Sequence, residues 1–321
     1  MIKRRFAIHS ASGMFEVYDS DQQEDCTQNN RSNLPELVPE NCSRTDWSNL
    51  PELAVIMVMK YLEDSDRGSM AQTCTTWARL VRTAALWRRR HVQLGIDHKS
   101  DRKAVQYFEQ FAGNLHQLSI ACQSRGFLTR FRLKENLAQI ISNITEKKPK
   151  LRALVINRLG LDRFRKFDVI KTRDRDLVNG MCKMFRGQTR MRVVKLPETY
   201  VRLVTGRRLL QALAKGSGPQ VATLNLIDFF QHGIAVYRVP NIQKIITSFT
   251  NLRKLAINFN CLSEEILLGV AKKTRGRLRH LTVRVHERDP HGHRINGRTW
   301  KAVRALCPEL QVEFEFDSIC T

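Results

Sequence analysis

The apolar positions in the last two thirds of the chain repeat as a triplet. Apolar residues stand at a first position and again three and five residues later, and successive triplets begin 26 to 40 residues apart. Alternation at the last two positions is typical of a strand that buries one face. The pattern therefore predicts strands at seven places: Leu115-Leu118-Ile120, Leu151-Leu154-Ile156, Met191-Val194-Leu196, Val221-Leu224-Leu226, Leu252-Leu255-Ile257, Leu278-Leu281-Val283 and a weaker Cys307-Leu310-Val312.

Stretches with helical spacing of apolar residues separate these triplets. They stand at residues 135–147, 207–216, 241–250, 263–276 and 298–308. A strand and a helix in each unit predict an irregular leucine-rich repeat, an α/β solenoid of the horseshoe type whose neighbouring units share a core. A doubly wound α/β sheet stays open as an alternative, although no glycine-rich phosphate loop follows any of the predicted strands.

The region before the repeats has the spacing of short helices. We expect a helix over residues 51–62, a second over 67–81, and a third near 84–92 that presents Leu86 and Trp87. Their apolar residues face almost every direction, and a unit of about 45 residues is small for a self-sufficient fold. These helices are therefore predicted to need a partner.

The first 45 residues are polar and carry too little apolar surface to offset the entropy of ordering them, so we expect a flexible tail. The sequence Asn-Leu-Pro-Glu-Leu occurs in this tail, at residues 33–37, and again at residues 49–53. Pro39 disfavours a helix after the first copy, whereas Pro51 suits a first helical turn. The second copy is thus predicted to begin the folded part, which divides the chain into residues 1–45, 46–95 and 96–321.

The short helices resemble the F-box in the order of six elements. Leu50-Pro51, an apolar run to Leu62, Asp64 and Asp66, a Cys74-x-x-Trp77 helix and Leu86-Trp87 match the pattern of that family. Arg67 departs from it, because the family usually has an apolar residue there. An alternative is that Trp77 and Trp87 belong to the core of a larger domain. The resemblance implies an Skp1-binding site formed by Leu50, Pro51, Val58, Met59, Leu62, Cys74, Trp77, Leu86 and Trp87.

The repeats also resemble one group of F-box proteins, F-box only protein 39 and its relatives. The matching stretches are Leu224-Asn225-Leu226-x-Asp228-Phe229-Phe230, Ala235-Val236-Tyr237, Asn260-Cys261-x-Ser263 and Asp289-Pro290-His291-Gly292. Proteins of that group continue for several more repeats. We therefore expect a shortened member whose last strand exposes an uncapped edge.

The family resemblance implies a non-catalytic substrate receptor of a ubiquitin ligase that contains Skp1, a cullin and a RING protein. A protein target would then bind the concave face of the sheet, where strand residues point away from the core. Acidic or phosphorylated targets are expected, drawn by a basic rim at Arg163, Arg165 and Lys166. The predicted target-binding residues are Ser119, Val155, Lys195, Asn225, Lys254, Asn258, Thr282 and Arg284.

The charge of the chain indicates an alternative function. The net charge of +23 lies entirely within residues 96–321, because the first 95 residues carry twelve basic and twelve acidic side chains. Basic runs mixed with aromatic residues stand at 87–91, 130–134 and 162–176. Such runs bind nucleic acid in some proteins and are solvated surfaces in others. The alternative function is therefore a scaffold for nucleic acid or another acidic partner, although a solvated surface is the favoured interpretation.

Little in the sequence indicates chemistry in this chain. No cofactor, catalytic group or metal site is predicted, because His286, His291 and His293 lie in a loop with Pro290 and Gly292 that favours a turn. The eight cysteines are scattered singly, which fits small core residues in a reducing compartment. With no secretory signal and no apolar run of membrane-spanning length, we expect a protein of the cytoplasm or nucleus.

Overall fold

The computed structural model describes residues 4–7, 50–62, 64–123, 127–160, 169–290 and 293–316. The chain divides into two compact units, one of residues His9–Thr83 and one of Met1–Ile8 with Ala84–Thr321. The flexible tail predicted for residues 1–45 lies outside the described residues except at Arg4–Ala7. None of the described helices is both long enough and apolar enough to span a bilayer.

The smaller unit consists of three short helices. They are α1 (Glu52–Met59), α2 (Asp64–Thr73) and α3 (Thr75–Val81). α1 follows Pro51, which stands at its N-cap, as the sequence predicts. The helix predicted over residues 67–81 is wrong in one respect, because it is two helices. The Cys74 sulfur accepts a hydrogen bond from the Trp77 amide at 3.4 Å and so caps a new helix.

Arg67, the residue that departs from the family pattern, holds the end of α1. Its Nε donates to the Met59 carbonyl at 2.7 Å and its Nη2 to the Lys60 carbonyl at 3.3 Å. The last carbonyls of a helix have no partners within the helix, and a basic side chain commonly supplies them. Arg67 therefore fixes the turn between α1 and α2.

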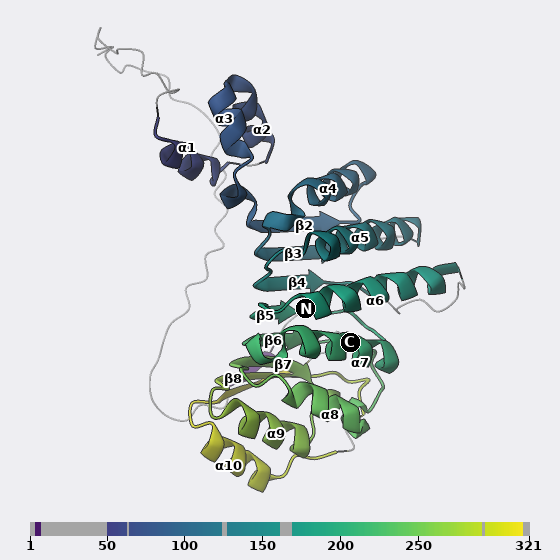
Figure 1. Ribbon diagram of the computed structural model, residues 1–321. Helices are drawn as coiled ribbons and strands as arrows, with labels where there is room; N and C mark the ends of the chain where they lie inside the picture. The colour runs from purple at the N-terminus through teal and green to yellow at the C-terminus, as the bar shows by residue number, and fades with distance from the viewer. Residues whose placement is uncertain are drawn as a thin grey trace, which may run out of the picture. The chain divides into compact units, whose positions relative to one another are not determined.

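The larger unit alternates parallel strands and helices (Figure 1). Its elements are β2 (Arg89–Leu94), α4 (His98–Phe111), β3 (Gln117–Cys122), α5 (Phe127–Lys147), β4 (Ala153–Asn157), α6 (Val169–Gly187), β5 (Val193–Lys195), α7 (Leu203–Ser217), β6 (Thr223–Leu226), α8 (Pro240–Thr247), β7 (Lys254–Asn258), α9 (Glu264–Thr274), β8 (His280–Val285), α10 (Gly297–Leu306) and β9 (Gln311–Phe316).

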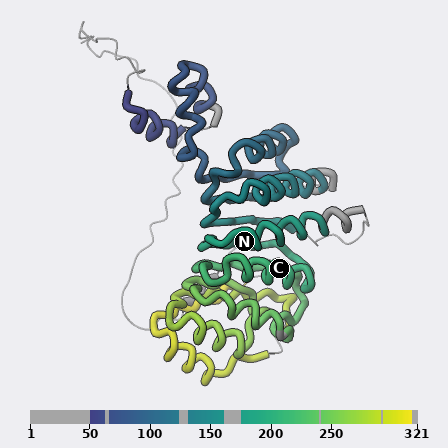
Figure 2. Tube along the Cα trace, in the orientation of Figure 1, coloured from purple at the N-terminus to yellow at the C-terminus, as the bar shows by residue number. Residues whose placement is uncertain are grey.

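The strands form one sheet in sequence order. Strands β2 to β9 are each paired in parallel with the next along the chain, and the tube in Figure 2 winds from one strand through a helix to the following strand. Equivalent triplet positions are neighbours in this register, so Leu118 pairs with Leu154, and Leu255 with Leu281. The leucine-rich-repeat-like α/β solenoid predicted from the triplets is confirmed.

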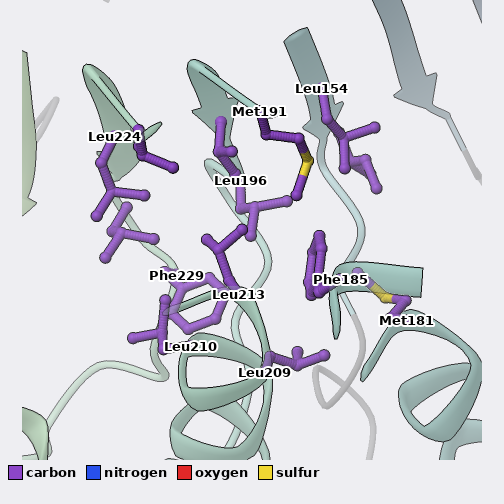
Figure 3. Packing of buried hydrophobic residues seen from close by; sticks show 14 of the residues in the cluster. Leu154, Met181, Phe185, Met191, Leu196, Leu209, Leu210, Leu213, Leu224 and Phe229 are labelled. Atoms are coloured by element: carbon purple, nitrogen blue, oxygen red, sulfur yellow. The ribbon is translucent and has the colours of Figure 1, made fainter. Parts of the chain in front are cut away.

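The core lies between the sheet and its helices. The apolar residues of the first six triplets are at most 2% exposed, and they pack against helix residues such as Phe185 and Leu213. Figure 3 shows this packing where Leu154, Met191 and Leu224 face α6 and α7. Each repeat thus buries its apolar face against its two neighbours, as expected of a solenoid.

Two predictions about the ends of the solenoid are wrong. Residues 84–92 do not form a helix, because a 3₁₀ turn at Ala84–Trp87 leads into β2, which is the first strand of the sheet. At the other end, β1 (Arg4–Ala7) pairs antiparallel with β9. The edge of β9 is thus covered over these residues, and the flexible tail does not extend to residues 4–7.

Candidate protein-interaction surfaces

The helical unit exposes apolar side chains along α1 and the residues beside it. Leu53 is 71% exposed, Val58 51% and Tyr61 86%, and Leu50 and Met57 are also exposed. A short helix that is apolar nearly all round cannot cover itself in a unit of this size. The sequence prediction of a partner-requiring helix therefore has a structural counterpart, and it includes three residues outside the predicted site, Leu53, Met57 and Tyr61.

Several residues of the predicted adaptor site are buried and do not lie on an exposed surface. Met59 is fully buried, so its side chain belongs to the core and not to a surface. Leu86 and Trp87 are buried in the larger unit, where the Trp87 ring stacks on Phe111 with centroids 4.5 Å apart. Trp87 is therefore a buried residue of the larger unit, beside Phe111 and Tyr107.

The other predicted adaptor residues are at least partly accessible. Val58 and Pro51 are exposed, Leu50 is 37% exposed, and Leu62 and Trp77 are half-buried. Cys74 is half-buried as well, and its sulfur is occupied by the cap of α3. The accessible part of the predicted site is therefore concentrated on α1 and its flanking residues.

The helix-free face of the sheet brings the predicted target-binding residues into rows. Ser119, Val155, Lys195, Asn225 and Thr282 follow one another across strands β3 to β8 in one row of the register, with Ala256 between the last two. None of these five is buried. Lys254 lies in the adjacent row beside His280 and is exposed.

The same rows continue onto strands that the sequence prediction did not include. Arg89 and His91 on β2 extend the basic end, whereas Glu313 and Glu315 on β9 supply carboxylates. Carboxylates therefore lie on this face at its C-terminal end. The face is basic at β2 and carries carboxylates at β9, and between them Lys195 and Lys254 stand among neutral side chains.

Two predicted target-binding residues are structural. Asn258 is 4% exposed, and its side-chain oxygen accepts from the Asp228 amide at 2.6 Å while its nitrogen donates to Asp228 Oδ1 at 2.9 Å. Arg284 Nη1 lies 2.9 Å from Asp228 Oδ2, and its Nη2 lies 2.9 Å from Glu315 Oε2. Asp228 itself is buried with a φ of 53°. The network holds a left-handed backbone position just after β6, where these side-chain bonds help to offset the strain.

The histidines considered for a metal site are not brought together. His291 lies outside the described residues, and His293 stacks between Tyr237 and Phe259 at 3.9 and 4.4 Å while its Nε2 contacts the Leu262 carbonyl. His286 instead joins two residues from other positions. Among the described residues, His232, His286 and Asp289 are the group whose ligand atoms lie within 4.8 Å of one another.

This second group is arranged for stacking. The rings of His232 and His286 lie 3.6 Å apart and nearly parallel, so their in-plane nitrogens point side by side and not toward one ion. His286 Nδ1 also accepts from the Arg288 amide at 3.1 Å. His232 Nδ1 faces Asp289 Oδ1 at 3.4 Å. The absence of a metal site stays a prediction.

The three basic runs of the sequence differ in how far their residues are buried and described. In the run 87–91 the aromatic residue is buried, and the Arg90 guanidinium lies over the Tyr107 ring at 4.3 Å. In the run 130–134, Leu133 and Lys134 are buried on α5. Residues 161–168 lie outside the described part, and with them the predicted basic rim at Arg163, Arg165 and Lys166. The described runs therefore offer no exposed aromatic residue for base stacking.

A basic feature that the sequence reading missed lies along the edge where the strands begin. The residue after the first apolar position of a triplet is Arg152, Arg192, Arg253 or Arg279 in four of the repeats, and Arg88 has the equivalent place before β2. All five are exposed. We call these five residues the arginine column. The sequence contains this pattern, because an arginine directly follows the first apolar residue in four of the triplets.

Comparison with known proteins decides the nature of the small unit. A family model described as F-box-like matches residues 47–93. The chain carries an F-box-like domain. The matched range includes all three helices and ends within β2, so the F-box-like match extends from the helical unit into the first strand of the solenoid.

The F-box-like chain is similar over most of its length to one mouse protein. It is 23% identical to F-box/LRR-repeat protein 21 of Mus musculus over 278 residues, which are 82% of this chain and 58% of that protein. A leucine-rich repeat-containing protein of Legionella pneumophila, LegL7, aligns with a TM-score of 0.35 and 12% identity over 69% of this chain and 70% of its own. The F-box-like match and the sheet of parallel strands with intervening helices together describe a chain that combines an F-box-like domain with a leucine-rich-repeat-like region.

Proposed function

We propose that this chain is the substrate-recognition subunit of a ubiquitin ligase of the Skp1-cullin-F-box type. The observation that carries the proposal is the exposed apolar face of α1 within an F-box-like domain, formed by Leu53, Val58 and Tyr61. Exposed apolar patches with a polar surround are typical of protein interfaces. The F-box-like domain would bind Skp1, and Skp1 would connect the chain to the cullin and the RING protein.

The solenoid would hold the target, and the chain itself would carry no chemistry. A sheet face with half-exposed polar residues such as Ser119, Asn225 and Thr282 suits hydrogen bonding with a protein segment. Catalysis would then be proximity, since the receptor places a target lysine near the ubiquitin-loaded enzyme. We place such a ligase in the cytoplasm or nucleus.

Binding to purified Skp1 tests the first half of this proposal. Leu53→Ala combined with Val58→Ala removes two exposed apolar side chains from α1. Interface anchors typically cost about 2 kcal/mol or more when truncated, so affinity should fall more than about tenfold, measured by isothermal titration calorimetry with the full chain. Both side chains are exposed, so the fold should persist with an unchanged circular dichroism spectrum.

The matched control is Val204→Ala on α7. Val204 is 62% exposed, comparable to the two test residues, but it lies on the solenoid. This control should bind Skp1 like the wild type. Equal affinity of the double variant and the wild type would overturn the adaptor role of α1.

A further inference from the structure

The arginine column is fixed by a repeating backbone pattern. The carbonyl of Arg152 accepts from the Arg192 amide at 2.7 Å and from the next amide, Val193, at 3.0 Å. The Arg253 carbonyl likewise accepts from Arg279 at 2.9 Å and His280 at 3.0 Å. His116 and Ala222 fill the two intervening places, and the same paired bonds run through their carbonyls. The column is therefore part of the sheet's own hydrogen-bond ladder.

The spacing of the column follows from this ladder. Adjacent strands lie about 4.8 Å apart, so the six steps from Arg88 to Arg279 span about 29 Å. The Arg88 backbone, at the edge of the sheet, is held by the His116 and Gln117 amides, and the backbones of the other four members are held by neighbours on both sides. The column is thus an exposed row of like charges on a hydrogen-bonded support.

Few carboxylates of the described residues pair with the column. Among the residues that the structure describes, Arg279 pairs with Glu309 at 3.2 Å, and no ion pair joins Arg88, Arg152, Arg192 or Arg253 to an acidic side chain. Other basic groups lie close by. Burial, with Lys254 and Arg279 nearby, lowers the pKa of His280.

The charges of the open face reinforce this asymmetry. The described carboxylates of the network, Asp228, Asp289 and Glu315, all lie at the ends of strands or after them. The column lies at the opposite edge, where the strands begin. The described carboxylates of the network are thus at the far edge from the column, where Arg284 pairs with two of them, and a ligand with negative charge is attracted to the edge where the strands begin.

We propose that the arginine column is the docking surface for an acidic, extended polypeptide segment of the target. That the bound segment belongs to a ligase target rests on the proposed function. Binding of an acidic segment to the column does not, because it does not require the F-box-like domain. Arginine guanidinium groups pair with carboxylates in a two-pronged geometry that lysine cannot copy. Among the described residues, four of the five arginines form no ion pair with a carboxylate, so their guanidinium groups can pair with carboxylates of a ligand.

An acidic polypeptide fits this edge better than a nucleic acid. Proteins that bind single strands combine a basic groove with aromatic side chains that stack on the bases. Of the described aromatic residues near the first strand, Trp87 is buried and Tyr107 is half-buried under Arg90. An extended peptide rises about 3.3 Å per residue, so about nine residues would follow the whole column.

The test uses a fluorescent peptide of twelve glutamates and the full chain. Arg152→Gln, Arg192→Gln and Arg253→Gln are combined in one variant, which removes three charges without removing a described ion pair. Fluorescence anisotropy should show that the variant binds the peptide at least about tenfold more weakly than the wild type at low salt. The dependence of affinity on salt should also become shallower, because fewer charges contribute.

A variant with the same change in net charge is the control. Lys183→Gln, Lys215→Gln and Lys273→Gln remove three exposed charges from α6, α7 and α9. If both variants lose affinity equally, the column is not a site and only net charge matters. An unlabelled oligothymidine of twelve nucleotides is tested as a competitor. If it displaces the peptide, and if the three arginine changes weaken its binding more than they weaken peptide binding, the proposal is overturned in favour of nucleic acid.

Stability and adaptor binding are measured on the same samples. Removing like charges should leave the melting temperature of the arginine variant unchanged or slightly higher, so loss of binding is separable from unfolding. The arginine variant should bind Skp1 like the wild type, and the Leu53/Val58 variant should bind the peptide like the wild type. Failure of the adaptor test alone would therefore leave the docking surface standing, and failure of the peptide test alone would leave the adaptor role standing.

Discussion

At the scale of single residues, the sequence identified polar positions but not their roles. Asn258 and Arg284 alternate with buried apolar residues, and that spacing correctly places them on the helix-free face. It could not reveal that both contact Asp228, which lies 30 and 56 positions away along the chain. A partner at that separation leaves no trace in periodicity, so residues that support the fold were read as target contacts.

Arg284→Glu should destabilise the protein strongly. The change would place a third carboxylate between Asp228 and Glu315, in a position where the arginine side chain is 15% exposed. Removing one partner from a buried ion pair costs about 3 kcal/mol or more. Lys254→Glu is the control, because Lys254 is exposed on the neighbouring strand and should change the free energy of unfolding by less than about 0.5 kcal/mol. Urea denaturation would give both values, and similar midpoints for the two variants would contradict this account.

At the scale of elements, triplet spacing predicted β3 to β9 because each strand buries its alternate residues. It missed β2, whose sequence Arg89–Leu94 opens with charged residues and follows a tryptophan that resembles an F-box ending. It also joined α2 and α3 into one helix. Cys74 is an ordinary apolar residue in a helical pattern, and only its contact with the Trp77 amide reveals a cap.

The joint between α6 and α7 depends on a glycine. A Cβ atom at Gly216 would lie 1.9 Å from the Phe185 carbonyl oxygen, so the two helices approach too closely for any side chain. Gly216→Ala should therefore reduce the free energy of unfolding by about 2 kcal/mol or more, since overpacking forces backbone shifts. The measurement is the urea midpoint of the purified variant.

Gly187→Ala supplies the comparison, because Gly187 ends α6 and a Cβ atom there would meet nothing within 4 Å. This variant should be neutral or slightly stabilised, by less than about 1 kcal/mol. Equal destabilisation of both variants would mean that helix propensity, and not the close approach, decides the outcome.

At the scale of the whole molecule, the division into a helical unit and a solenoid was readable from composition and spacing. The boundary was not, because the F-box pattern runs to Trp87 while the fold assigns that residue to the solenoid, where it stacks on Phe111. The net charge of the solenoid region follows from the sequence, but the sequence did not show which basic residues lie side by side on the surface. Successive arginines of the column are 26 to 64 residues apart along the chain, and they come into one row only when the repeats stack. The finer resemblance to F-box only protein 39 stays a prediction.

The buried thiols should report the integrity of the solenoid from end to end. Burial raises the pKa of Cys122 to about 12, and it also raises the pKa values of Cys182, Cys261 and Cys307. Because the thiolate is the reactive form, these four should resist iodoacetamide at pH 8 until urea unfolds the chain. Peptide mass spectrometry would locate the modification, and half-buried Cys74 should be the first of the five described cysteines to react. Rapid labelling of Cys122 or Cys261 in the folded protein would show that the solenoid opens far more readily than its packing indicates.

The paired bonds that each strand-start carbonyl makes have a consequence for how such a chain can change its length. Every repeat presents the same acceptor to its successor, and the successor presents the same two amides in return. Excising one whole repeat, for example residues 191–220, would bring the Ala222 amide to the place that the Arg192 amide now occupies. The new junction would reuse an existing geometry, so genes for this fold can gain or lose repeats as complete modules while the sheet stays continuous.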